Sequence, residues 1–99
     1  MGEELRTTFA STVGGVMTEE AGAVTGDLEL LTRRTEAGDG ALEVLVRYAG
    51  AEEWYTVSGS PVAASGEHHR ASHEAVLARL TAPGPVEDGN ELPVDLRGC

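Results

Sequence analysis

The alternation of apolar and polar residues is most regular in the middle of the chain. Apolar residues occupy every second position over residues 42–48, and residues 27–33 repeat the pattern, which is the period of a half-buried strand. A Gly-Asp-Gly sequence at residues 38–40 separates the two runs. A second short turn precedes a third run, residues 54–58, which is rich in aromatic and β-branched residues. Because short turns join neighbouring strands, we expect a three-stranded antiparallel meander.

Helical periods flank this meander on both sides. Within residues 3–20, apolar side chains recur at spacings of three and four residues, although two adjacent glycines interrupt the pattern. A second helix is expected within residues 67–80, with Ser65 or Ser72 as its N-cap. The predicted order is therefore α-β-β-β-α. This order favours an α+β two-layer sandwich, with both helices on one face of the meander.

The composition changes after residue 82. Residues 83–99 contain three of the four prolines, four acidic residues and no aromatic residue, a composition typical of segments without a packed core. We therefore predict one α+β domain over residues 1–82, followed over residues 83–99 by an acidic tail that is extended or disordered. A chain of 99 residues is long enough to bury one modest core.

The charge balance narrows the choice of partner. The chain carries 17 acidic residues against 7 basic ones, a net charge of −10. Nucleic acids and anionic membrane surfaces both require clustered positive charge, so this excess argues against both. It favours a protein partner, of basic character. A single cysteine, Cys99, the absence of an apolar leader and the absence of a long apolar run predict a cytoplasmic protein.

Three histidines lie close together near the start of the second predicted helix. His69 and His73 are four residues apart, so on a helix they share one face, with His68 beside them. This spacing can place two imidazoles on one divalent metal ion, with a carboxylate such as Glu74 as a third ligand. It also continues the apolar stripe of the helix, so the histidines can equally border the core. A pH-sensing or catalytic role is the third interpretation.

The two adjacent aromatic residues of the third predicted strand must face opposite sides of the sheet. We expect Trp54 on the side covered by the helices and Tyr55 on the open side. The open side then carries a small apolar patch, of the kind that marks an interface between proteins or between two copies of one chain. The candidate interaction residues are Leu31, Leu45, Tyr55 and Val57.

The sequence contains no catalytic arrangement. Ser58 and Ser60 lie in a loop without the spacing of a nucleophile elbow, and residues 38–40 lack the lysine and following helix of a phosphate loop. We therefore expect no catalytic residues and no organic cofactor. The leading hypothesis is a non-enzymatic protein–protein interaction module of chaperone, immunity or adaptor type, able to form a homodimer. The alternative is a domain that binds a divalent metal or small ligand through His68, His69 and His73.

Overall fold

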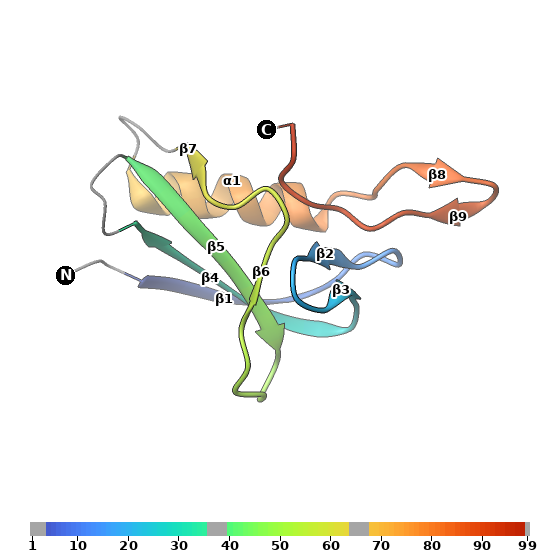
Figure 1. Ribbon diagram of the computed structural model, residues 1–99, viewed down its shortest axis with the longest axis horizontal. Coiled ribbons are helices and arrows are strands. Elements are labelled where there is room, and N and C mark those ends of the chain that lie inside the picture. Colours follow the sequence, from blue (N-terminus) through green and yellow to red (C-terminus); the bar gives the residue numbers. More distant parts are fainter. Residues whose placement is uncertain (1–3, 36–39, 64–67, 99) are drawn as a thin grey trace.

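The computed structural model describes residues 4–35, 40–63 and 68–98 (Figure 1). Its centre is an antiparallel sheet in the order β1-β4-β5-β6, with β7 pairing with the start of β5. The strands are β1 (Glu4–Ala10), β4 (Asp27–Arg34), β5 (Ala41–Tyr48), β6 (Tyr55–Thr56) and β7 (Val62–Ala63). Helix α1 (His69–Thr81) contacts β1 and β4 on one side of this sheet.

The architecture is a mostly-β α+β fold, which corrects the predicted α-β-β-β-α sandwich. The described residues form one helix, one five-stranded sheet and two small hairpins. The first hairpin pairs β2 (Val16–Thr18) with β3 (Gly22–Val24), and the second pairs β8 (Val86–Glu87) with β9 (Asn90–Glu91). A bilayer-spanning helix is absent from these residues.

The helix predicted over residues 3–20 is wrong, because the described part of this region forms β1, a loop and β2. Burial along β1 alternates from residue to residue, so that Phe9 is buried between exposed neighbours, which is the two-residue period of a strand. Leu5 and Phe9 are four residues apart, and that spacing places them on one side of either a helix or a strand. The loop that follows contains Gly15 at φ 81°, a value that no helix accommodates.

The central part of the prediction is confirmed in its main elements. β4 and β5 form the two expected strands and pair with each other along their length. The third expected strand, residues 54–58, is shorter: only β6 pairs with β5, and Val57 then bridges to Thr18 of β2. Most of the turn expected at residues 38–40 lies outside the described residues, but Gly40 has the positive φ that such a turn needs.

Helix α1 lies where the second helix was predicted, but its N-cap differs. His68 occupies the cap position and makes no capping hydrogen bond with its side chain. Ser72 lies inside the helix and is buried, so it is not the cap, and Ser65 lies outside the described residues. The helix ends at Thr81, two residues before Pro83, whose ring cannot continue a helix.

The hydrophobic core lies on the side of the sheet that faces α1. Leucines and valines of β4 and β5 form the sheet side of this core, and Val76 and Leu80 of α1 pack over them. Val16 and Val24 of the first hairpin close one end. The contiguous cluster of buried residues among those described is Phe9, Val16, Val24, Leu28, Leu30, Val44, Val46, Val57, Val76, Leu80, Val94 and Leu96.

Residues 83–98, expected to form an extended or disordered tail, contain the β8–β9 hairpin and two core side chains, Val94 and Leu96. This segment runs back into the body of the molecule beside β2 (Figure 1). The amide of Met17 donates to the carbonyl of Val94 at 2.9 Å, and the amide of Leu96 donates to that of Ser58 at 2.9 Å. Gly59, at φ 97°, leaves no room for a Cβ, which would lie 2.5 Å from the backbone of Leu96. The last part of the chain is therefore built into the core.

Candidate functional site

The two buried histidines and two threonines form one hydrogen-bonded chain between α1 and the sheet. His73 Nε2 lies 2.8 Å from Thr7 Oγ1 on β1, and His73 Nδ1 lies 2.7 Å from Thr32 Oγ1 on β4. The same Thr32 oxygen lies 2.9 Å from Nε2 of His69. His73 is only 2 % exposed and Thr32 is completely buried. The chain therefore connects the helix to two strands through polar groups that are buried, apart from the half-buried Thr7.

This chain is satisfied when both imidazoles are neutral. Thr32 Oγ1 carries one proton, so it donates to one imidazole nitrogen and accepts from the N–H of the other. A neutral His73 then donates to one threonine and accepts from the other. A protonated His73 has two N–H donors, so Thr32 could no longer donate to it, and the hydrogen-bond sequence would have to change.

Burial also works against a charge on His73. The pKa of His73 is lowered from its ordinary value, first because the side chain is desolvated and then because His69 and Arg70 lie near it, while Glu74 opposes the shift weakly. An imidazole with a lowered pKa is neutral at pH 7 and resists protonation until the solution is more acidic. The geometry and the pKa therefore agree on a neutral, structural His73 with a response to acid.

The structure brings together only part of the proposed metal site. His69 and His73 share Thr32, whereas His68 is exposed at the helix N-terminus and Glu74 is exposed on α1. Within residues 4–35, 40–63 and 68–98, His, Cys, Asp and Glu side chains form no group of three that could hold a metal ion. Both ring nitrogens of His73 already contact threonine hydroxyls. A metal would have to displace these hydrogen bonds.

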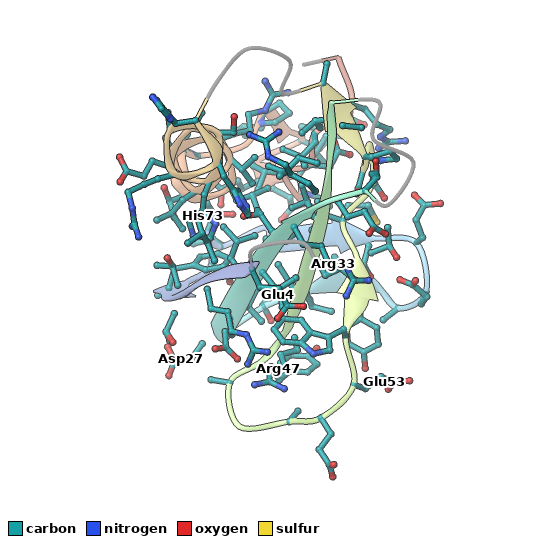
Figure 2. All side chains as sticks on the ribbon, turned by 90° about the vertical axis from the view of Figure 1, so that its left-hand side faces the viewer. Glu4, Asp27, Arg33, Arg47, Glu53 and His73 are labelled. Carbon is teal, nitrogen blue, oxygen red and sulfur yellow. The ribbon has the colours of Figure 1, made fainter. Side chains whose placement is uncertain are left out.

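The opposite face of the sheet carries charged residues in rows across the strands. The pairing register places Glu4, Arg33 and Glu43 side by side in one row, and Thr8, Glu29 and Arg47 in another. Arg33 contacts Glu43 at 3.1 Å and Glu4 at 3.8 Å, and Arg47 contacts Glu29 at 2.7 Å. Figure 2 shows Glu4, Arg33 and Arg47 on the side away from α1, with His73 between α1 and the sheet. We call this face the open face.

Trp54 lies on the open face, which reverses the predicted positions of the two adjacent aromatic residues. Its ring lies 4.2 Å from the guanidinium carbon of Arg47 and 5.6 Å from that of Arg6, measured to the ring centroid. Tyr55 instead pairs with Val46, packs against the core and makes an edge-to-face contact with Tyr48. The length of the loop between β5 and β6 determines whether Trp54 or Tyr55 faces the core. A loop one residue longer or shorter would exchange the two side chains.

The predicted interaction residues divide between the two faces. Leu31 and Leu45 are neighbours in the middle row of the open face, as expected. Leu31 is nonetheless only 3 % exposed, although α1 lies on the other side, so neighbouring side chains of this face cover it. Tyr55 and Val57 are not on the open face: Tyr55 packs on the core and Val57 belongs to it. The apolar patch is therefore smaller than predicted.

Sequence reasoning missed the residues that dominate the open face, Arg6, Arg47 and Trp54. A signal for them was present. Charged residues occupy alternate positions of β1, β4 and β5, as in Glu29 and Arg33, and this is how the solvent side of a half-buried sheet appears in a sequence. Because residues 3–20 were predicted to be helical, the alternating charges of β1 were not recognised as part of a sheet face.

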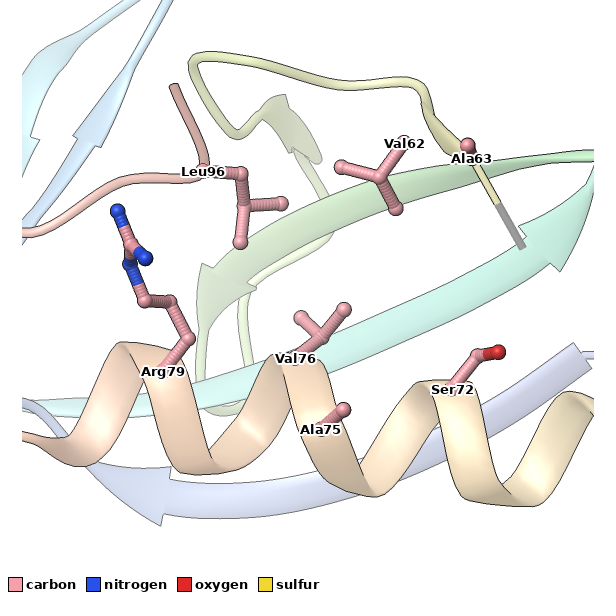
Figure 3. A pocket seen from close by; sticks show the side chains of 7 residues that line it. All are labelled: Val62, Ala63, Ser72, Ala75, Val76, Arg79 and Leu96. Atoms are coloured by element: carbon pink, nitrogen blue, oxygen red, sulfur yellow. The ribbon is translucent and has the colours of Figure 1, made fainter. Parts of the chain in front are cut away.

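A small cavity lies between α1 and the C-terminal segment (Figure 3). Its volume is about 160 Å³, and most of its lining is apolar. Arg79 stands at one end, where its guanidinium donates to the backbone carbonyls of Asp95 at 3.1 Å and Arg97 at 3.2 Å. Pockets for drug-sized ligands are typically about 300 Å³ or larger. The volume of this cavity is therefore below the range of such pockets. Arg79, beside it, anchors the C-terminal segment.

Comparison of the chain with protein-family models, with curated proteins and with solved structures gives no match.

Proposed function

We propose that this protein is a non-enzymatic protein–protein interaction module that binds its partner through the open face. The observation that carries this proposal is the position of Trp54 between Arg47 and Arg6 on a face that α1 does not cover. Tryptophan and arginine are the residue types most enriched among the side chains that dominate binding energy at protein interfaces. Here they are placed together where folding of the core does not need them.

The charges of this face support a protein partner. The described charged residues of this face are Glu4, Asp27, Glu29 and Glu43 against Arg6, Arg33 and Arg47, a sum of −1 within a chain of net charge −10. Most of the excess negative charge therefore lies elsewhere on the molecule. A nearly neutral face with a partly buried indole and two leucines has the mixture of apolar centre and polar surround typical of interfaces.

Site-specific photo-crosslinking tests this proposal. A photoreactive phenylalanine analogue would replace Thr8, an exposed open-face residue, and in a matched control it would replace Ala78, an exposed residue of α1. In cells that express the protein, we expect a protein adduct from position 8 and none from position 78. Loss of the adduct on Trp54→Ala would confirm that the face binds. Equal adducts from both positions, or none from position 8, would contradict the proposal.

A further inference from the structure

We infer that the occupant of the open face is a second copy of this chain, related by a two-fold axis along the row of Arg6, Leu31 and Leu45. This inference rests on the proposed function and names its partner. Two copies of net charge −10 repel each other over most of their surfaces. The open face is nearly neutral, so this repulsion is smallest there, and the partly exposed Leu45 and Trp54 supply its apolar surface.

The pairing register shows that the two outer rows of this face are complementary to each other. A two-fold axis in the interface, along the middle row, places each strand opposite the same strand of the partner and exchanges the two outer rows. Arg33 then faces Glu29 of the second copy, and Glu43 faces Arg47. Glu4 faces the uncharged Thr8, and Arg6, on the axis, faces Arg6 of the second copy.

Charge disfavours the alternative orientation. An axis parallel to the strands, along β4, would place β1 opposite β5 of the second copy. Glu4 would face Glu43, and Arg33 and Glu29 would each face themselves. Like charges placed opposite each other across an interface are strongly unfavourable. In the first orientation only Arg6 faces a like charge, so the charges favour the axis on which Arg6, Leu31 and Leu45 lie.

Two charge-reversal variants test this arrangement. Each variant alone should fail to form a homodimer, whereas the two variants mixed together should form a heterodimer. In the Arg33→Glu variant, Glu faces Glu29 at both symmetry-related positions, and in the Glu29→Arg variant, Arg faces Arg33 at both. In a heterodimer of the two variants, every one of these contacts pairs opposite charges. Arg33 is 43 % exposed and Glu29 is 20 % exposed, so neither is a buried charge, and ion pairs that water can reach contribute little to folding. Both variants should therefore fold. Arg70→Glu, on the exposed side of α1, makes the same charge change away from the face.

Analytical ultracentrifugation of the purified full chain gives the readout. We expect the parent and Arg70→Glu to sediment at twice 10.3 kDa and to dissociate only on dilution. We expect each open-face variant alone to dimerise at least about tenfold more weakly, and their equimolar mixture to regain the parent affinity. Circular dichroism verifies that each variant folds.

Three results would overturn the inference: a monomeric parent at about 100 μM, where micromolar interfaces are saturated, a stable dimer of Arg33→Glu, or a mixture that stays monomeric. The failure of the dimer and the failure of the proposed function are distinguishable. If the parent is monomeric while position 8 crosslinks to another protein, the dimer is wrong and the interaction module stands. If position 8 crosslinks to nothing, both are wrong.

Discussion

The two faces of the central sheet are made by the same strands but are stabilised differently. On the face toward α1, leucines and valines are buried, and the polar groups form a neutral chain of threonine and histidine. On the open face, arginines and glutamates pair at partial exposure around one tryptophan. The polar side chains between α1 and the sheet are held in hydrogen bonds to one another, while the charged side chains lie where water can reach them.

The largest difference between the faces should appear when apolar volume is removed. Leu30→Ala empties a completely buried position on the α1 side and should lower the free energy of unfolding by about 3 kcal/mol, through lost transfer energy and a residual cavity. Leu45→Ala, at a partly exposed position of the open face, should cost about 1 kcal/mol. Urea unfolding followed by circular dichroism measures both. Equal losses would mean that the two leucines are equally buried.

The buried hydrogen-bonded chain can be broken without changing side-chain volume. Thr32→Val keeps the shape but removes the hydroxyl that contacts both His69 and His73. We expect a loss of about 2 kcal/mol, because buried imidazole nitrogens are left without that partner. Thr8→Val makes the same change at an exposed open-face position and should stay within about 0.5 kcal/mol of the parent. A Thr32→Val variant as stable as Thr8→Val would show that the chain contributes nothing.

Acid should lower the free energy of unfolding first through His73, which lies on the α1 face. The pKa of His73 is lowered in the folded protein, whereas the unfolded chain has an ordinary histidine pKa of about 6.5. Between these values the unfolded state binds more protons, so stability is complete above about pH 6.5 and falls as the pH drops below it. The slope is at most about 1.4 kcal/mol per pH unit for one proton.

The pH dependence has its own controls. His73→Gln should flatten the profile between about pH 6.5 and pH 5, above the range in which ordinary carboxylates titrate. Thr8→Val, which removes no titratable group, should leave the slope unchanged. Chemical unfolding at a series of pH values measures all three proteins. A slope that survives in His73→Gln would assign the response to another group.

The smallest effect on stability is expected for the cation–π contact of the open face. Arg47→Ala removes the cation 4.2 Å from the Trp54 ring and the ion pair with Glu29, and should lower the free energy of unfolding by about 1 kcal/mol or less. Since Trp54 is the only tryptophan, its fluorescence should shift to longer wavelength as the ring becomes more exposed. Arg70→Ala serves as the control, and an unchanged spectrum in Arg47→Ala would argue against the contact.

Sequence periodicity correctly predicted those elements whose residue pattern is compatible with only one type of secondary structure. Strands β4 and β5 alternate over eight residues each, and α1 combines a helical stripe with a terminating proline. Strand β1 was missed because Leu5 and Phe9 satisfy both periods, and the threonines between them, which favour strands, were given too little weight. Local patterns distinguish helix from strand poorly in a seven-residue segment.

The candidate sites were predicted only in part, for a related reason. The shared face of His69 and His73 follows from helical spacing, but the threonines that bind them come from two distant strands, so no local pattern could reveal them. Trp54 was assigned to the wrong side because its orientation depends on the exact length of a loop. The core positions of Val94 and Leu96 depend on backbone pairing with β2 and Ser58, which local composition does not report.

The built-in C-terminal segment also has a consequence for how the chain reaches its fold. The amide of Gly14 donates to the side chain of Glu91, 77 positions away, and the backbone of Val94 pairs beside that loop. Contacts between such distant positions require a large loop to close before any of their energy is recovered. Proteins dominated by such pairings fold in milliseconds to seconds, more slowly than helical bundles. The kinetics should therefore resemble those of a β-barrel more than those of a small helical domain.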